Sequence, residues 1–502
     1  MSPTSRPVLG HGTGAARERL RILYVAAEVA PFAKTGGLAD VAGALPQALA
    51  RLGHDVRVVM PRHRGVEATA GALRVAVPRL AVSVGGRIVE GSLLEGRLGD
   101  GVPVYFVAQD GYYDRPALYG ARDDCERYVF FCRSVLEALP SLGWMPQVVH
   151  ANDWQAGLIP VYLETLYRDM PAYADVATVF TVHNLAYQGV FWHYDLPMTG
   201  LGWDLFTPAG IEFYRHLSLL KGGLVFADLL TTVSPTYARE IQTPAFGERM
   251  DGVLRERSAD LVGILNGLDV TVWNPATDPD IPKRFDRDDP GGKGACTAAL
   301  RDEMELPDSG RRTPLVGVVS RLAAQKGLDL VAGSVPAIRA AGAQLVVLGS
   351  GEEPLEQLLG QLARAHPESV AVRIGFDDRV ARRIYAGADL FLMPSRYEPC
   401  GLGQLIALRY GAVPVVRRTG GLADTVRPWG RTTGDGTGFL FDELSADACA
   451  GALTRAFDAH GDPAAWRRLV ANGMAADFSW DASAESYLTC YRRAIRKARR
   501  HA

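Results

Sequence analysis

Lys34-Thr35-Gly36-Gly37-Leu38-Ala39-Asp40 is the stretch of sequence that decides the fold, because it recurs as Arg418-Thr419-Gly420-Gly421-Leu422-Ala423-Asp424. Six of the seven positions are identical, and the seventh is a cation in both copies. Each copy follows a short apolar run, 22–26 in the first half and 413–416 in the second, and precedes a stretch with helical spacing. Each copy is therefore predicted to be a strand–loop–helix junction, as α/β folds contain.

Such a junction favours a bound anion. The start of a helix has unpaired N–H groups and roughly half a positive charge, and glycine lets a phosphate approach the backbone. The simplest hypothesis is that two α/β domains face one phosphate-bearing ligand across a cleft. The residues predicted to meet it are Lys34, Gly36, Gly37, Thr419, Gly420 and Gly421. The alternative is that Thr-Gly-Gly only turns the chain at both places.

Length and composition indicate a globular protein of two domains. A chain of 502 residues suits two domains of more than 200 residues each, and 48% hydrophobic with 22% charged residues is typical of soluble folds. A net charge of −2 argues against nucleic acid as a partner. The six cysteines form no Cys-x-x-Cys pair, and no run has the length and purity of a membrane span. We therefore expect a cytoplasmic protein that is not bound to a membrane. The sequence leaves the oligomeric state open, with a homo-oligomer as one alternative.

Short apolar runs alternate with longer amphipathic stretches throughout the chain. In the second half, strands are predicted at 315–319, 344–348, 370–374, 390–393 and 413–416, with helices starting near Gly327, Glu352, Asp378 and Leu402. In the first half, strands are predicted at 22–26, 56–60, 102–107, 148–150, 178–182 and 229–233. This order predicts two doubly wound parallel sheets. The passage between Gly267 and Pro314, rich in Pro, Asp and Gly, is predicted to cross the surface near the domain junction and to act as the hinge.

Charged residues follow the predicted strands of the second half, where open α/β sheets bind ligands. Arg321 comes just after the strand at 315–319, and Lys326 lies at the next helix start. Two cations at this place suit a diphosphate, with solvated surface charges as the alternative. Glu398 lies in a crowded turn after the strand at 390–393, where the alternative role is a helix cap.

The first half has polar clusters at the equivalent place. Asp153 follows the strand at 148–150, and His183 follows the strand at 178–182. Because the carboxyl ends of parallel strands lie at one edge of a sheet, the two clusters together indicate a sugar site. The alternative is that both side chains are simply buried and hydrogen-bonded.

These motifs together resemble one family. From about Arg21 to Tyr491 the chain resembles bacterial glycogen synthases and plant starch synthases, which are retaining glycosyltransferases of GT-B architecture. The resemblance rests on segments 34–38, 150–154, 181–189, 264–267, 320–327 and 398–402, which read KTGGL, HANDW, TVHNLAYQG, ILNG, SRLAAQKG and EPCGL.

The resemblance implies a fold, an activity and residue roles. It implies an α/β protein of GT-B architecture, with two Rossmann-like doubly wound parallel-sheet domains facing a central cleft. Residues 21–265 would form the first domain, residues 480–502 a helix returning to it, and residues 266–479 the nucleotide-sugar domain. The implied reaction moves glucose from ADP-glucose to the 4-hydroxyl end of an α-1,4-glucan such as glycogen, with retention and with neither cofactor nor metal. The implied catalytic residues are His183, Glu398, Asp153, Arg321 and Lys326. The implied substrate-binding residues are Lys34, Gly36, Gly37, Asn184, Asn266, Cys400, Gly401, Leu402, Thr419, Gly420 and Gly421.

Within this resemblance, Arg321 and Lys326 would hold the donor diphosphate and Lys34 would approach it from the opposite domain. Glu398 would lie near the glucose hydroxyls and His183 near the anomeric centre. The amides around Gly420 would bind the distal phosphate. The sequence departs from the wider pattern at Ile406, where a second glutamate is common, at Asn152, where histidine is common, and in the loop 246–250.

Two alternatives remain open from the sequence. One is a related GT-B transferase that uses UDP-glucose, and the other is a non-catalytic sensor of nucleotide sugar or glucan. A dinucleotide oxidoreductase is disfavoured, because no Gly-x-Gly-x-x-Gly follows the first strand.

Overall fold

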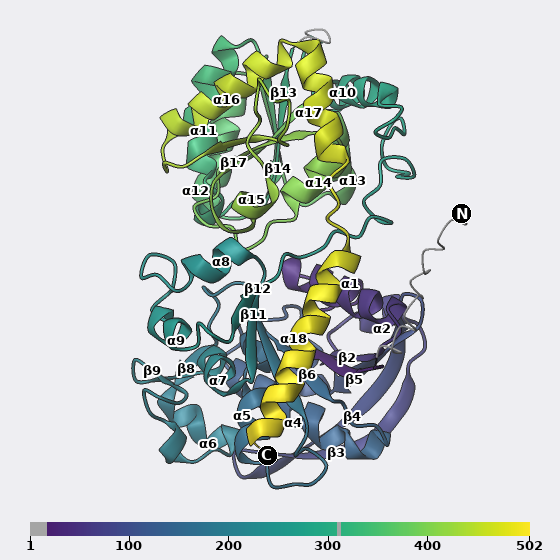
Figure 1. The fold of residues 1–502 in the computed structure, drawn as a ribbon, viewed down its shortest axis with the longest axis vertical. Helices are drawn as coiled ribbons and strands as arrows, with labels where there is room; N and C mark the ends of the chain where they lie inside the picture. The colour runs from purple at the N-terminus through teal and green to yellow at the C-terminus, as the bar shows by residue number, and fades with distance from the viewer. Residues whose placement is uncertain (1–17, 309–312, 502) are drawn as a thin grey trace, which may run out of the picture.

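The computed structural model describes residues 18–308 and 313–501, which form two lobes, each built on its own sheet (Figure 1). The first sheet has the order β12-β11-β7-β6-β1-β2-β5-β4-β3 and the second β15-β14-β13-β16-β17-β18. The first comprises β1 (Arg21–Val25), β2 (Asp55–Pro61), β3 (Arg74–Val84), β4 (Arg87–Leu98), β5 (Val102–Ala108), β6 (Val148–Asn152), β7 (Ala177–Val182), β11 (Leu229–Thr232) and β12 (Leu261–Gly263). The second comprises β13 (Leu315–Val319), β14 (Gln344–Gly349), β15 (Val370–Ile374), β16 (Leu390–Met393), β17 (Val413–Arg417) and β18 (Phe439–Phe441).

Helices cover both sheets. Those of the first lobe are α1 (Gly37–Arg51), α2 (Val66–Ala70), α3 (Asp110–Tyr113), α4 (Asp124–Ala138), α5 (Leu158–Thr165), α6 (Leu196–Thr199), α7 (Leu219–Phe226), α8 (Pro235–Glu240) and α9 (Asp251–Glu256). Those that follow are α10 (Gly291–Glu303), α11 (Leu328–Ala340), α12 (Glu353–Ala365), α13 (Asp378–Gly387), α14 (Gly403–Arg409), α15 (Gly420–Thr425), α16 (Ala446–His460), α17 (Pro463–Met474) and α18 (Trp480–His501).

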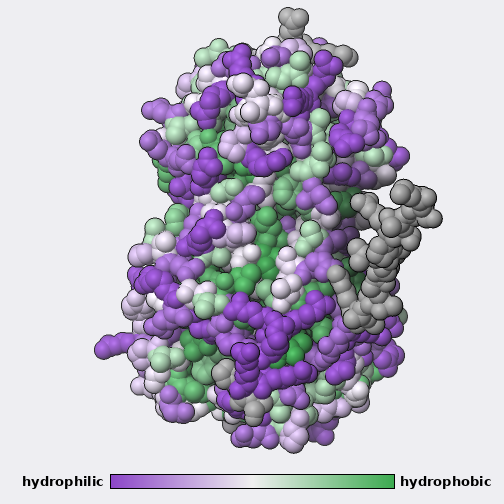
Figure 2. Space-filling view, viewed as in Figure 1, coloured by the Kyte–Doolittle hydropathy of each residue, from purple (hydrophilic) through white to green (hydrophobic). Residues whose placement is uncertain are grey.

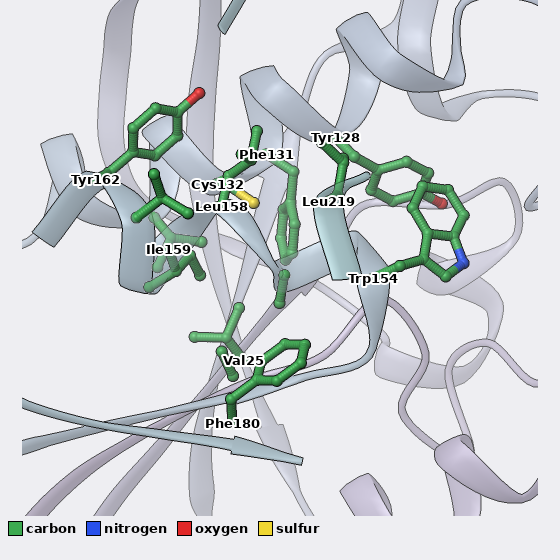
Figure 3. Packing of buried hydrophobic residues seen from close by; sticks show 14 of the residues in the cluster. Val25, Tyr128, Phe131, Cys132, Trp154, Leu158, Ile159, Tyr162, Phe180 and Leu219 are labelled. Atoms are coloured by element: carbon green, nitrogen blue, oxygen red, sulfur yellow. The ribbon is translucent and has the colours of Figure 1, made fainter. Parts of the chain in front are cut away.

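The strands predicted from apolar runs are all present and pair in parallel. Every residue of β7 is buried, because helices cover both faces of the sheet. In the core of the first lobe, side chains of β1 and β7 meet those of α4 and α5 (Figure 3), among them Val25, Phe131, Ile159 and Phe180. This confirms the predicted α/β class with parallel sheets.

Strands β3 and β4 are antiparallel and were not predicted from the sequence. Buried and exposed residues alternate along β3, and charged side chains such as Arg79 and Glu90 pair on its outer face. Only one face of these strands is buried, so they lack the continuous apolar run of the central strands.

The passage between Gly267 and Pro314 differs from the prediction. It contains helix α10, whose Cys296 and Leu300 are buried in the core of the second lobe. Helix α10 was not predicted because it begins with glycines, which disfavour a helix. The amide of Leu268 donates to the carbonyl of Phe478, 2.6 Å away, so two chain segments cross between the lobes side by side.

Helix α18 returns to the first lobe and lies along it (Figure 1). The apolar stripe predicted on this helix, which includes Tyr487, Leu488 and Tyr491, is buried in the core around β1 and α1. The division at residues 265 and 480 stays a prediction. It is supported by the first sheet ending at Gly263 and by α18 beginning at Trp480.

A second connection between the lobes joins α8 to α15. Asp424 of α15 accepts hydrogen bonds from the amide and hydroxyl of Thr236, both 2.7 Å away, at the start of α8. Glu240, at the end of α8, accepts from the amide of Gly420 and the hydroxyl of Thr419, at 3.1 and 2.9 Å. A carboxylate on each of these two short helices therefore accepts hydrogen bonds at the start of the other helix. These contacts join the lobes in addition to the two chain segments that cross between them.

The surface is hydrophilic over most of both lobes, with hydrophobic residues gathered at the waist between them (Figure 2). Among the described residues, no helix combines the length and the apolar character needed to cross a membrane. All six cysteines are buried and unpaired. The cytoplasmic location stays a prediction.

Candidate active site

A cavity of about 190 Å³ lies at the carboxyl ends of β13 and β16 in the second lobe. Its lining includes Arg321, Lys326, Ser395, Glu398 and Gly401. The Nζ of Lys326 lies 2.6 and 2.9 Å from the two carboxylate oxygens of Glu398, and the hydroxyl of Ser395 donates to the same carboxylate at 2.9 Å. Glu398 is almost fully buried, so this ion pair is shielded from solvent. The structure thus brings together the three charged residues predicted in this lobe.

The backbone places these side chains. Gly327 precedes α11 with a φ of +67°, and a Cβ there would lie 2.2 Å from the carbonyl oxygen of Pro394. Only glycine lets the start of α11 approach the turn at 394–398 this closely. Arg396 clamps the same turn through a bidentate pair with Asp329, at 2.7 and 2.8 Å. The turn and the helix start therefore hold Lys326 and Glu398 face to face.

Residues at the start of a helix also line this cavity. Gly401, with a φ of +74°, and Leu402 line it just before α14 begins at Gly403. The first N–H groups of a helix have no acceptor within the helix. The cavity therefore combines two cations with the amide end of a helix, an arrangement suited to a polyanion.

The repeated Thr-Gly-Gly turns bind carboxylates of the chain itself. In the first copy, Glu28 accepts from the amides of Thr35 and Gly36 and from the Thr35 hydroxyl. In the second copy, Glu240 accepts from Thr419 and Gly420. The predicted anion chemistry is present in both copies, but the anion is a glutamate.

Two further predicted residues lie apart from the cavity. The amide of Gly421 donates to the carbonyl of Glu398 at 3.0 Å, so this amide is already used. Lys34 pairs with Asp40 at 2.7 Å in an exposed position, and the cavity lining does not include it. The amides of Gly420 and Gly421 are thus already used, whereas Gly401 and Leu402 line the cavity.

The first lobe holds Asp153 and His183 at the carboxyl ends of β6 and β7. The carboxylate of Asp153 accepts from the amide of His183 at 2.7 Å, and the Nε2 of His183 lies 2.9 Å from the Oδ1 of Asn152. The amide nitrogen of Asn152 donates to two carbonyls, Val25 and His150. Its Oδ1 must therefore be the acceptor, which fixes the His183 proton on Nε2 and leaves Nδ1 with its lone pair.

The electrostatics of this pair follow from burial. Burial raises the pKa of Asp153 to about 7, the Glu28 carboxylate adds to the rise, and the amides of His183 and Asn184 oppose it. Burial lowers the pKa of His183 to about 3, so its imidazole is neutral at pH 7. Asp153 also has a φ of +55°, which is uncommon for a residue other than glycine. Strained residues with shifted pKa values cluster at functional sites.

The two lobes meet around Cys400. Cys400 is buried against the core of the first lobe, and the amide of Asn266 donates to its sulfur; burial raises the pKa of the thiol to about 12. The Oδ1 of Asn266 is buried and has no hydrogen-bond partner among the described residues. Asn184 reaches the hydroxyl of Tyr397, next to Glu398. An orphaned buried oxygen at this boundary indicates a place for a ligand hydroxyl.

Comparison with known proteins identifies the family. Residues 21–256 match the family described as "Starch synthase catalytic domain", and residues 313–459 match "Glycosyl transferases group 1". The glycogen synthase of Syntrophotalea carbinolica is 51% identical over 482 residues, which cover 95% of this chain and 99% of that protein. The chain belongs to the glycogen synthase family. The glycogen synthase of Moorella thermoacetica is 48% identical, with 96% and 98% of the two chains covered.

Solved structures agree with this family. The catalytic domain of starch synthase IV from Arabidopsis thaliana, solved bound to ADP and acarbose, superposes with a TM-score of 0.88 at 34% identity, covering 95% of this chain and all of that one. Sucrose-phosphate synthase from Thermosynechococcus elongatus, at 19% identity and a TM-score of 0.58, shares the fold. The chain is thus a GT-B glycosyltransferase, as the sequence predicted.

This chain is predicted to need no metal, although its sequence contains two Asp-x-Asp pairs, a pattern that holds a divalent ion in many metal-dependent transferases. Asp278 and Asp280 form one pair, Asp286 and Asp288 the other. The carboxylate of Asp278 is buried and paired with Arg382 at 2.9 Å. Among the residues that the structure describes, no group of three or more His, Cys, Asp or Glu is placed to hold a metal ion. The prediction of no metal remains untested.

Some residues of the site were missed in the sequence. Ser395 donates a hydrogen bond to Glu398. Glu28 accepts hydrogen bonds from the Thr35 turn, and the hydroxyl of Tyr119 donates to Glu28 at 2.6 Å. Glu28 follows β1 at the carboxyl edge of the sheet, so the rule that found Asp153 could also have found it. Ile406, where the wider pattern has a second glutamate, is buried in the core of the second lobe.

Proposed function

We propose that this glycosyltransferase moves glucose from ADP-glucose to the 4-hydroxyl at the non-reducing end of an α-1,4-glucan, with retention of configuration. Its partners are the nucleotide sugar and the glucan, and no cofactor is proposed. The ADP bound to the Arabidopsis starch synthase supports the choice of donor.

The observation that carries this proposal is the cavity with Lys326 and Glu398 in contact. We assign the diphosphate of the donor to Arg321, Lys326 and the amides at Gly401 and Leu402. Glu398 then lies beside the transferred glucose, where a carboxylate accepts hydrogen bonds from sugar hydroxyls. Lys326 lies between the carboxylate and the diphosphate.

The first lobe completes the sugar site in this proposal. Asn266 offers its unpaired Oδ1 to a glucose hydroxyl, and Asn184 and Cys400 lie at the same boundary. His183 is neutral and presents Nδ1 near the anomeric centre, with Asp153 holding its backbone. Lys34, on the Thr35 turn, approaches the donor when the lobes close.

The chemistry follows from charge. Breaking the sugar–phosphate bond leaves an oxocarbenium-like sugar and a diphosphate with added negative charge. Fixed cations and amides that oppose this charge as it develops lower the barrier most in a dry site. We propose that the 4-hydroxyl attacks from the face of the leaving phosphate, which takes the proton, so the configuration is retained. A trapped covalent glucosyl–enzyme would contradict this route.

The experiment that tests the function is donor turnover. The purified protein is incubated with ADP-glucose or UDP-glucose, with and without glycogen and with and without a chelator, and nucleoside diphosphate release is measured with glucan extension. Glycogen-dependent release from ADP-glucose that survives chelation supports the proposal. Faster release from UDP-glucose would favour the related UDP-glucose transferase, and donor binding without release would favour a sensor.

A further inference from the structure

Exposed aromatic side chains are concentrated in one part of the first lobe. Among the residues that the structure describes, six aromatic side chains are conspicuously exposed, and five of them lie between residues 187 and 214. These five are Tyr187, Trp192, Tyr194, Trp203 and Tyr214, each 52–62% exposed. Large exposed aromatic surface costs free energy in water unless something binds there.

Four of these rings belong to one patch around a small sheet of β8 (Val190–Trp192), β10 (His216–Ser218) and β9 (Glu212–Phe213), seen on the flank of the first lobe in Figure 1. The rings of Trp192 and Tyr194 are 4.6 Å apart. His193 lies 6.2 Å from Phe206, which lies 5.6 Å from Trp203. We call the aromatic platform the set Trp192, His193, Tyr194, Trp203, Phe206 and Tyr214.

The backbone holds the platform in place. Side chains of a strand alternate between its faces, so Phe191 of β8 points inward while Trp192 points outward. The Phe191 ring packs 5.8 Å from Trp154, which belongs to the core shown in Figure 3. Trp192 thus lies on a strand anchored in the core, and His193 and Tyr194 follow it directly in a short 3-10 helix.

Contacts link the platform to the candidate active site. The guanidinium of Arg249 lies 5.3 Å above the ring of Tyr214. Its neighbour Glu248 accepts from Gln188 at 2.9 Å and lines a cavity of about 240 Å³ together with Tyr397. Tyr397 precedes Glu398. A series of contacts therefore links Tyr214 of the platform, through Arg249 and Glu248, to Tyr397, the residue before Glu398.

We infer that the aromatic platform binds the acceptor glucan away from its reacting end, an inference that rests on the proposed function. A glucose ring has apolar C–H faces and a rim of hydroxyls. Tyr and Trp match this pattern, because each combines an apolar ring with one polar group at its edge. Trp192, Tyr194, Trp203 and Tyr214 are already exposed, so these rings are accessible to a sugar.

The test compares a platform variant with a matched control. Trp192→Ala/Tyr194→Ala removes two rings, and Ile88→Ala removes a side chain as exposed as Tyr214, at 62%, from strand β4. We expect the platform variant to raise the half-saturating concentration of glycogen at least about tenfold, as truncating aromatic anchors of a binding surface does. The half-saturating concentrations of ADP-glucose and of maltotriose, an acceptor of three glucose units, stay unchanged. Ile88→Ala leaves all three unchanged.

Sedimentation with glycogen in the absence of donor reports on the platform separately from catalysis. We expect the platform variant to bind less glycogen than the unsubstituted chain, even if neither transfers glucose. Unchanged glycogen binding overturns the inference, as does equal weakening for maltotriose. A change in molecular mass with glycogen binding intact also overturns it, because the platform would then join two copies of the chain. Failure of the proposed function appears differently, as no diphosphate release by the unsubstituted chain.

Discussion

Replacing Lys326 by alanine should remove most of the turnover while the protein remains folded. The substitution removes the cation that contacts both oxygens of Glu398 at 2.6 and 2.9 Å and lines the donor cavity. Losing one preorganised group that opposes transition-state charge lowers kcat by about 10²- to 10³-fold, or roughly 3–4 kcal/mol. Removing one partner of a buried ion pair also costs about 3–5 kcal/mol of stability, and the hydrogen bond that Glu398 keeps from Ser395 favours the lower end of this range.

The assay pairs initial rates at saturating donor and glycogen with the free energy of unfolding in urea. Lys326→Ala/Glu398→Gln serves as the control, because it removes both charges and so leaves no unpaired buried carboxylate. We expect this double variant to regain stability and to remain inactive. A loss of activity that matches the fraction unfolded, or recovery of turnover in the double variant, would refute the assigned role.

Three other predictions concern the lobes and their buried groups. Burial raises the pKa of Asp153 from 3.8 to about 7, so between these pH values the folded state binds a proton that the unfolded state does not. The free energy of unfolding therefore falls as pH rises from about 4 to 7. Asp153→Asn should reduce this fall, measured by urea unfolding at pH 5 and pH 8. Asp424→Ala removes the acceptor of two Thr236 hydrogen bonds and should lower stability by about 1–3 kcal/mol, seen as a lower melting temperature, whereas no change would mean that this contact between the lobes is negligible. Asn152→Leu removes the acceptor that fixes the His183 tautomer. It should lower kcat about 10-fold or more and leave the KM for the donor little changed. Asn152→His should retain more activity, and equal losses of kcat in the two variants would contradict the assigned role of Asn152.

Much of the fold could be predicted from the sequence, because its central strands are buried on both faces. Runs such as 315–319 and 390–393 are continuously apolar and contain few competing signals. The pair β3 and β4 escaped prediction because one face is solvated and carries charges. Helix α10 escaped it because glycines at its start resemble a loop.

In the candidate site, too, some contacts could be predicted from the sequence and others could not. Arg321, Lys326 and Glu398 could be predicted to meet, because each follows a parallel strand at the same edge of one sheet. The partner of the second Thr-Gly-Gly turn could not, because Glu240 lies 180 residues before Gly420 in the sequence and reaches it only when the lobes pack. Local sequence shows that a turn can hold an anion, and tertiary structure decides which anion it holds.

The most direct test of the proposed function is to determine which glycosidic bond the protein forms. The protein is given ADP-glucose labelled in the glucose and unlabelled glycogen, and the product is digested with an exo-acting amylase that cleaves only α-1,4 bonds from non-reducing ends. The account predicts that the label enters glycogen and is released in the first maltose units. Absence of label in glycogen, or label that resists this digestion, would contradict it.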